Sequence, residues 1–311
     1  MHGKPWSIVL AGGEGRRLRE LTTTRAGVTV PKQFCSLAGG PSLLAETLAR
    51  AERLSTRERI LVVVSARHER FWCDELCGLP RENVIVQSQT RGTAASLLLP
   101  LISILERDLD AQIAVLPSNH HVVDESVLQR AFASALDAVR GDPRRIVLLG
   151  ITPDTADPQY GWIVPRASGT MPGGAASIEL FIERPSRETA RRLHARGALW
   201  SSFLFASQGL GLFAAFSRAQ PALVRAFATR PLEAIARNLP LLDFSRDVLE
   251  RVTDRLAVVR VPPCGWSDLG TPDRIARVLR ARGARVCHAG APNAPRARVP
   301  VLAHALESLA P

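Results

Sequence analysis

Residues 7–18 read SIVLAGGEGRRL, an apolar run followed at once by three glycines and two arginines. The apolar run predicts a buried strand over 7–11, because unbroken apolar segments of this length are typical of strands covered on both faces. Glycines directly after a strand allow the backbone to approach a ligand and to turn its N–H groups toward phosphate oxygens. Open α/β sheets bind their ligands at this end of the strands. The stretch therefore predicts an α/β fold with a phosphate-binding turn, and a plain strand-to-helix connection is the alternative.

Two kinds of cation follow this turn. Arg16 and Arg17 lie where the phosphates of a nucleotide would bind, although the turn matches neither G-x4-G-K-[ST] nor G-x-G-x-x-G, since Leu18 fills the last glycine position. Lys32, in the segment VPKQF, is one of two lysines among 40 basic residues. A lysine kept in an arginine-rich chain favours a need for a compact ammonium group, with chance as the alternative.

The alternation of strand and helix continues outward from this stretch. Apolar runs predict strands over 59–65, 83–86, 112–116 and 145–149. Amphipathic segments between them predict helices over 42–54, 94–107 and 126–140. Such alternation predicts right-handed crossovers and a Rossmann-like, mostly parallel sheet flanked by helices.

The second half of the chain is more mixed. It predicts strands over 177–183, 199–207 and 255–261, and helices over 186–194 and 271–282. The arginines of 184–196 and 274–285 are expected to form solvated helix faces. No linker marks a boundary, so we expect a single large domain at 5–283 and a short tail at 284–311.

Composition narrows the classes of function. Hydrophobic residues at 46% and charged residues at 22% exclude disorder as the main state. The net charge of +11 suits phosphorylated small molecules; the basic residues are spread out and aromatics reach only 5%, unlike the basic, aromatic stripe of a nucleic-acid binder. Five cysteines form neither a disulfide framework nor a zinc set, and no segment resembles a secretory leader or a membrane span. We expect a cytoplasmic protein with no nucleic-acid or membrane partner.

Further motifs occur in a fixed order along residues 7–275. After LAGGEGRRL and PKQF come QSQTRGTAA at 87–95, LPSNH at 116–120, YGWI at 160–163, FIERP at 181–185, WSS at 200–202 and WSDLG at 266–270. In this order they resemble the motifs of the sugar-1-phosphate nucleotidyltransferases, most closely the mannose-1-phosphate guanylyltransferases. The resemblance implies the nucleotidyltransferase fold and leaves room for a homo-oligomer.

The same resemblance implies a Mg²⁺-dependent reaction of a nucleoside triphosphate, GTP, with a sugar 1-phosphate, mannose 1-phosphate, to give GDP-mannose and pyrophosphate. It implies that the nucleotide contacts Leu10, Ala11, Gly12, Gly13 and Gly15, with its base at Gln87, Gly92 and Thr93. It implies that the sugar contacts Gly161, Glu183, Ser201 and Ser202. Arg17 and Lys32 would be the catalytic cations, and Asp268 and Asn119 the metal ligands.

Several positions depart from the family pattern. Asn119 replaces the metal-binding Asp of L-P-S-D-H, from which we expect weaker metal binding, recruitment of Asp124 or another acid, or loss of turnover. Ser201 and Phe203 alter the sugar motif, and Gly92 alters the base loop. The alternatives are therefore the same chemistry with another sugar or base, or a binding homologue of low activity. His120 is expected to make a structural hydrogen bond.

Overall fold

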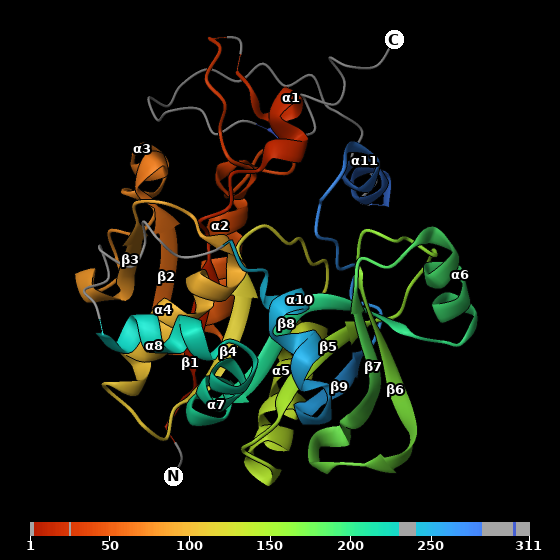
Figure 1. Cartoon of the computed structure of the whole chain (residues 1–311). Coiled ribbons are helices and arrows are strands. Elements are labelled where there is room, and N and C mark those ends of the chain that lie inside the picture. The colour runs from red at the N-terminus through yellow and green to blue at the C-terminus, as the bar shows by residue number, and fades with distance from the viewer. Residues whose placement is uncertain (1–2, 25, 230–240, 282–300, 303–311) are drawn as a thin grey trace.

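The structure is a computed structural model that describes residues 3–24, 26–229, 241–281 and 301–302. Its strands are β1 (Trp6–Leu10), β2 (Ile60–Ser65), β3 (Val84–Gln87), β4 (Gln112–Pro117), β5 (Ile146–Ile151), β6 (Gly161–Thr170), β7 (Ala176–Glu183), β8 (Leu199–Gln208) and β9 (Leu256–Val261). Its helices are α1 (Arg19–Thr22), α2 (Leu43–Glu52), α3 (Glu69–Trp72), α4 (Gly92–Leu105), α5 (Glu125–Gly141), α6 (Arg187–Ala195), α7 (Gly209–Ala219), α8 (Pro221–Thr229), α10 (Phe244–Asp247) and α11 (Pro272–Ala281). Figure 1 labels most of them.

The nine strands form one sheet in the order β3-β2-β1-β4-β8-β5-β9-β7-β6. The pairings make β7 and β8 antiparallel to the other seven strands, so the predicted mostly parallel α/β sheet is confirmed. All strands and helices predicted from apolar patterns are present within three residues of their expected ends. Strand β6 and helices α7 and α8 were not predicted, because YGWI was interpreted only as a motif and no pattern was assigned to 209–229.

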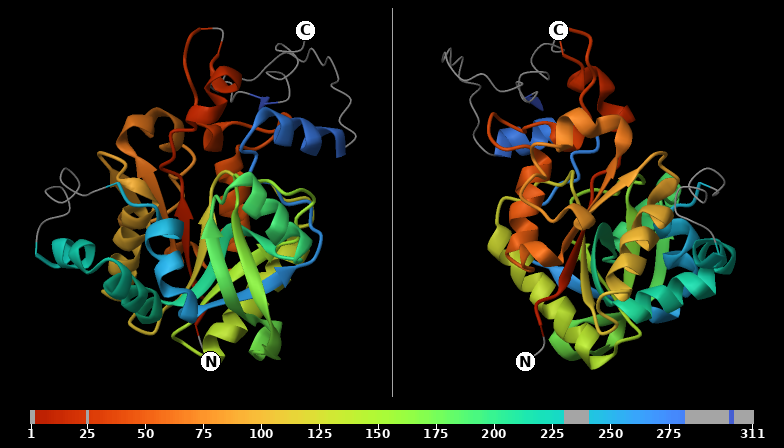
Figure 2. Two further views of the ribbon diagram at one scale, coloured as in Figure 1. Left: turned by 45° about the vertical axis from the view of Figure 1, so that its right-hand side comes forward. Right: turned by 90° about the vertical axis from the view of Figure 1, so that its left-hand side faces the viewer.

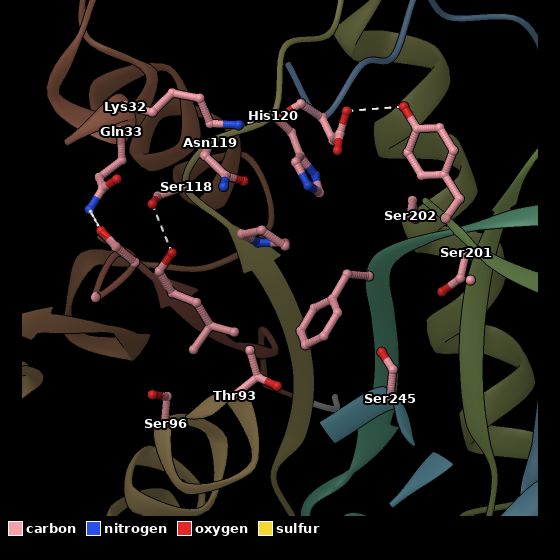
Figure 3. Close-up of a pocket in the computed structure, with 18 of the residues that line it drawn as sticks. Lys32, Gln33, Thr93, Ser96, Ser118, Asn119, His120, Ser201, Ser202 and Ser245 are labelled. Carbon is pink, nitrogen blue, oxygen red and sulfur yellow. Dashed lines mark hydrogen bonds between the residues drawn. The ribbon is translucent and has the colours of Figure 1, made fainter. Parts of the chain in front are cut away.

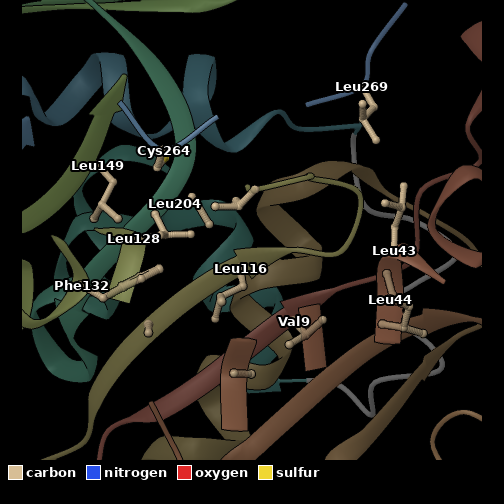
Figure 4. Close-up of a cluster of buried hydrophobic side chains, with 14 of the residues drawn as sticks. Val9, Leu43, Leu44, Leu116, Leu128, Phe132, Leu149, Leu204, Cys264 and Leu269 are labelled. Atoms are coloured by element: carbon tan, nitrogen blue, oxygen red, sulfur yellow. The ribbon is translucent and has the colours of Figure 1, made fainter. Parts of the chain in front are cut away.

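Alternate residues of the central strands enter two separate cores. In β1, Val9 packs with α2 and α5 on one face, whereas Ile8 packs with α4, α7 and α10 on the other. Figure 4 shows part of the first cluster, with Val9, Leu44 and Phe132 buried between strands and helices. Burial on both faces explains why these strands are apolar throughout. A smaller third cluster joins Trp162 and Trp200 to α6.

Strand β8 changes neighbours along its length, and this opens the sheet. Residues 205–208 pair with β4, whereas residues 199–201 pair with β6. An irregularity opposite Leu149 separates the two parts, and Phe203 in it has a φ of 61°. Strands β4 and β6 therefore diverge beyond the irregularity, beside the carboxyl end of β4.

Helices α1 and α11 lie on the side of the sheet at which β1 ends. In all three views of Figures 1 and 2 they are above the sheet. The predicted tail at 284–311 falls outside the described residues except for Val301 and Leu302, and the Leu302 N–H donates to the Ser36 carbonyl over 2.9 Å. Within the described part of the chain, every helix is too short or too polar to cross a lipid bilayer.

Candidate active site

A cavity of about 320 Å³ lies between the carboxyl ends of β1 and β4 and the amino end of β6, where β4 and β6 diverge. Figure 3 shows side chains from distant parts of the chain around it, with Lys32 and Asn119 on one side and Ser201 and Ser245 on another. The structure brings most of the expected site residues to its lining: Leu10, Gly12, Gly13, Arg17, Lys32, Gly92, Thr93, Asn119, Gly161, Glu183, Ser201, Ser202 and Asp268.

The Gly-rich turn follows β1 and is held by hydrogen bonds from the Gln33 side chain. The side-chain amide of Gln33 donates to the carbonyls of Ala11 and Gly13, both over 2.8 Å. Gly15 has a φ of 63°, and a Cβ there would lie 3.1 Å from the backbone nitrogen of Lys32. The glycine therefore serves both the left-handed turn and the close approach of the PKQF segment. Sequence reasoning gave Gln33 no role, although it lies in that motif.

Two of the expected nucleotide residues in the turn do not line the cavity. Ala11 is fully buried, and its N–H donates to the Val63 carbonyl over 2.8 Å. Gly15 packs behind the turn against Lys32. Both residues lie outside the lining of the cavity, and the contacts expected for Ala11 and Gly15 with a nucleotide stay predictions.

Lys32 is buried, and its ammonium group donates to the backbone carbonyls of Asp268 and Leu269. Burial lowers the pKa of Lys32 to about 8, against the opposing effect of Asp268. Arg17 is exposed, and its guanidinium donates to the Gln159 side chain over 3.3 Å. The cavity thus carries one buried and one exposed cation beside the Gly-rich turn.

The expected base-recognition loop is covered by a segment that the sequence motifs do not include. A Cβ on Gly92, whose φ is 85°, would lie 2.1 Å from the Leu242 carbonyl oxygen. The Ala94 N–H donates to that carbonyl over 3.1 Å, and the Phe244 N–H donates to the Thr93 hydroxyl over 2.7 Å. Glycine is thus required at this position by both φ and the close backbone contact.

Gln87 is buried at the end of β3 and is not among the residues that line the cavity. Its side-chain amide oxygen accepts from the Ser96 hydroxyl over 2.9 Å. Ser96 lines the cavity, so Gln87 holds the hydroxyl of a lining residue. The expected contact of Gln87 with the base stays a prediction.

Three expected sugar residues lie side by side on neighbouring strands. Gly161 of β6 pairs with Glu183 of β7 and with Ser201 of β8. A Cβ on Gly161 would lie 2.6 Å from a Glu183 carboxylate oxygen, so only glycine leaves room for this carboxylate. Burial, together with the negative charge of Asp243, raises the pKa of Glu183 to about 7. The group presents hydrogen-bond acceptors suited to hydroxyls.

Ser202 and Phe203 form the irregular part of β8. The Ser202 hydroxyl donates to the Leu149 carbonyl over 2.6 Å and accepts from the Leu204 N–H over 3.1 Å. Its hydroxyl is therefore committed to the backbone, although Ser202 touches the cavity. Phe203 adopts a left-handed conformation that favours glycine, and its ring packs against Phe244.

The two expected metal ligands, Asn119 and Asp268, both line the cavity. Their oxygens are of the kind that Mg²⁺ prefers. However, the Asp268 carboxylate accepts from Arg274 over 2.9 and 2.8 Å and from the Tyr160 hydroxyl over 3.0 Å. Burial opposes ionisation, but Arg274 and then Lys32 outweigh it and hold the pKa of Asp268 below its usual value. With Asp268 engaged in this way, the pair does not fit a Mg²⁺ site.

Neighbouring acids do not complete the set. Asp124 is exposed and caps α5, accepting from the N–H groups of Ser126 and Val127, so it is not the expected substitute. No group of three or more His, Cys, Asp or Glu side chains in the described ranges is placed to hold a metal ion. His120 is buried, accepts from the Trp266 indole over 3.3 Å, and has its pKa lowered to about 3 by burial. The expected structural hydrogen bond of His120 is confirmed.

A glycine turn at the carboxyl end of a parallel strand, with cations beside it and a polar wall opposite, defines a nucleotide-binding α/β protein. The sequence pattern of the family described as nucleotidyl transferase matches residues 6–282. The chain therefore belongs to the nucleotidyl transferase family.

Similar proteins agree with this assignment. The xanthan biosynthesis protein XanB of Xanthomonas campestris pv. campestris (strain B100) is 28% identical over 299 residues, which cover 91% of this chain and 61% of XanB. The mannose-1-phosphate guanylyltransferase RfbM of Salmonella typhimurium (strain LT2) is 28% identical over 284 residues, 85% of this chain and 56% of RfbM. The chain thus spans about six tenths of the length of these relatives.

A solved structure is similar across most of the fold. The crystal structure described as mannose-1-phosphate geranyltransferase from Thermus thermophilus superposes with a TM-score of 0.77 at 28% identity. The match covers 89% of this chain and 79% of that chain. The nucleotidyltransferase fold expected from the motifs is therefore confirmed.

Proposed function

We propose that this chain condenses mannose 1-phosphate with GTP to give GDP-mannose and pyrophosphate. The observation that carries the proposal is one cavity that joins the Gly-rich turn, with Arg17 and Lys32, to the polar group of Gly161, Glu183 and Ser201. Two substrates can face each other there, a nucleotide on the turn and a sugar phosphate on the strands. The name of RfbM supports this choice of sugar and base.

The reaction follows from the positions of these groups. An anionic oxygen of the sugar phosphate attacks the α-phosphorus, and a new P–O bond forms as the bond to the bridging oxygen of the β-phosphate breaks. Pyrophosphate leaves with that electron pair, and no proton has to be transferred. The protein therefore contributes positioning and charge neutralisation, for which Lys32 and Arg17 lie beside the turn. Mg²⁺, as the counter-ion of the triphosphate, supplies further neutralisation of phosphate charge.

Binding is divided between the two sides of the cavity. Backbone groups of Gly12 and Gly13 approach the phosphates and ribose, while Thr93 and Ser96 lie where the base binds. Glu183 and Ser201 accept hydrogen bonds from sugar hydroxyls. The described cysteines are free thiols, which supports the cytoplasm as the compartment, and relatives named for xanthan and alginate biosynthesis support a role in polysaccharide synthesis.

Two other functions are favoured by particular residues. Ser201 and Phe203 line the cavity and differ from the sugar motif of the family, which favours the same reaction with another sugar phosphate. Gly92 differs from the base loop of the family, which favours another base. Asn119 and the engaged carboxylate of Asp268 favour a binding homologue of low turnover.

Pyrophosphate release distinguishes these functions. The chain is incubated with mannose 1-phosphate and each of GTP, ATP, UTP, CTP and dTTP, with and without Mg²⁺. Release with GTP alone supports the proposal, and release with another triphosphate overturns the choice of base. If no pyrophosphate is released with any triphosphate or with other sugar 1-phosphates, while calorimetry still detects nucleotide binding, the chain is the homologue of low turnover.

A further inference from the structure

Arg274 lies behind the lining of the cavity, in contact with Tyr160 and Asp268, which do line it. It lies in the first turn of α11, in an arginine-rich helix whose arginines were expected to face solvent, yet it is only 6% exposed. One guanidinium nitrogen donates to both oxygens of Asp268, over 2.9 and 2.8 Å. The other terminal nitrogen donates to Asp157 over 2.6 Å. The expectation of a solvated face is wrong at this residue, because α11 packs its first turn onto two carboxylates.

The surroundings hold this guanidinium in place. Its central carbon lies 4.0 Å from the centroid of the Tyr160 ring, a cation–π contact. The Tyr160 hydroxyl donates to Asp268, so aromatic ring, guanidinium and carboxylate form one closed group. A Cβ on Gly270 would lie 2.5 Å from an Asp268 carboxylate oxygen and 2.7 Å from an Arg274 nitrogen, so a larger residue would push this ion pair aside.

These contacts use most of what the Asp268 carboxylate can accept. One oxygen accepts from Tyr160, from the Gly270 N–H and from Arg274, and the other accepts from Arg274. An ionised carboxylate offers about four lone-pair positions in all. A divalent cation at Asp268 would have to displace a guanidinium that cannot lose its charge, or bind directly beside it.

The charges nearby are already balanced. Asp157 and Asp268 face Arg274, and the Lys32 ammonium lies on the Asp268 backbone carbonyl. Asn119 brings no charge where the family pattern has an acid. Among the described residues that line the cavity, Glu183 is the sole other carboxylate, and it lies with the sugar group.

We infer that Arg274, instead of a metal ion held by two acids, is the resident positive charge at this corner of the site. Asp268 serves as the anchor of Arg274, and Mg²⁺ enters only with the triphosphate. Arg274 is thus a positioning residue. It fixes Asp268 and Tyr160, and with them the backbone carbonyl of Asp268 that accepts from the Lys32 ammonium group. The inference rests on the proposed function, because the triphosphate that brings Mg²⁺ is the substrate proposed there.

Mn²⁺ binding, followed by electron paramagnetic resonance without any turnover, tests this inference. The proteins compared are the natural chain, Asn119→Asp, Arg274→Met and the double variant. We expect weak Mn²⁺ binding by the natural chain and by Asn119→Asp, and binding at least about tenfold tighter by the double variant, because only there are both acids free. Arg277→Met, which removes the exposed partner of Asp154 one turn along α11, is the matched control and leaves Mn²⁺ binding unchanged.

Two results would overturn the inference: Mn²⁺ binding by the natural chain as tight as that of the double variant, or full tightening by Asn119→Asp alone. If Arg274→Met does not fold, Arg274→Gln in the Asn119→Asp background replaces it, since glutamine keeps hydrogen-bond donors for the carboxylates but carries no charge. Tightening is again expected, and unchanged binding contradicts the inference. Because Mn²⁺ binding needs no reaction, a failed pyrophosphate assay affects only the proposed function.

Discussion

The wall of the cavity that carries the Gly-rich turn and the wall that carries Gly161, Glu183 and Ser201 use different parts of the chain to face a ligand. The first presents backbone, at Gly12 and Gly13, supported by Gln33 from below. The second presents the side chains of Glu183 and Ser201, on the two strands that pair with the strand of Gly161. A backbone wall depends on conformation, whereas a side-chain wall can change its ligand without changing the fold.

The two walls also differ in backbone strain. Around the first wall, the left-handed positions are glycines, Gly15 and Gly92. Among the described residues, the non-glycine residues with positive φ are Arg184, Phe203 and Leu269. Arg184 and Phe203 line the cavity with the second wall, whereas the Leu269 carbonyl accepts from Lys32. Such conformations cost roughly 1–2 kcal/mol each and concentrate at functional sites. The second wall is therefore the more strained one, and the chain departs from the family pattern there at Ser201 and Phe203, as it does elsewhere in the cavity at Gly92 and Asn119.

The largest effect is expected at the cation beside the first wall. Lys32→Met should lower the rate of pyrophosphate release by about 10²–10³-fold, as removal of one stabilising group at a developing charge does. Nucleotide binding measured by calorimetry should change much less. Lys4→Met, at the other, exposed lysine, is the control. Equal rates for the two variants would remove Lys32 from the reaction.

The second wall predicts a dependence of stability on pH. Because the pKa of Glu183 is raised to about 7, the folded state keeps its proton after the unfolded state, with the usual value of 4.5, has lost it. Stability should therefore fall as pH rises from about 4.5 to 7 and stay level above, by roughly 3 kcal/mol in total.

Glu183→Gln should remove this part of the pH dependence. Urea unfolding at pH 5 and pH 8 measures it, with Glu179→Gln, at a half-exposed glutamate of the same strand, as the control. A Glu183→Gln variant with the same pH dependence as the natural chain would show that this carboxyl ionises normally.

Gln33 supports the first wall through its side-chain amide and also lines the cavity. Gln33→Ala leaves the Ala11 and Gly13 carbonyls without their buried donor, at a cost of about 1–3 kcal/mol, and nucleotide binding should weaken by about tenfold. Gln112→Ala also removes two hydrogen bonds, with Leu136 and Arg140, but far from the cavity. Calorimetry that finds both variants equally weak in nucleotide binding would contradict a specific role for Gln33.

The second wall should be sensitive to added bulk. Gly161→Ala places a Cβ 2.6 Å from the Glu183 carboxylate, which must shift, so the KM for the sugar phosphate should rise by several-fold, up to about tenfold, with a smaller change for the nucleotide. Gly40→Ala, where a Cβ meets nothing within 4 Å, is the matched control. A rise in the nucleotide KM alone would place the sugar elsewhere.

The smallest effect concerns strain. Arg184→Gly relieves a φ of 49° at a half-exposed residue and should stabilise the chain by up to about 1 kcal/mol, offset in part by the flexibility of glycine. Arg187→Gly, at the first position of α6, should instead destabilise it by a similar amount. Thermal unfolding measures both, and loss of stability in each would mean that Arg184 is not strained.

Much of the site could be predicted because its motifs are short. Most residues of these motifs do line the cavity: Leu10, Gly12, Gly13, Arg17, Lys32 and Thr93. Ala11, Gly15 and Gln87 do not, because a motif does not indicate which of its residues face inward. The contact between Leu242 and Gly92 could not be predicted from the sequence, since nothing local to either segment specifies it.

The sequence by itself determined the position of the Gly-rich turn and most strands and helices, with β6, α7 and α8 as the exceptions, because apolar periodicity and glycine conformation are local properties. Only the tertiary structure decided that Gly161, Glu183 and Ser201 meet, through the register of three strands. It also decided that Arg274 turns inward to Asp157, 117 positions earlier in the chain. An arginine on an amphipathic helix faces water or a buried carboxylate according to what packs against it, and that packing is set by distant segments.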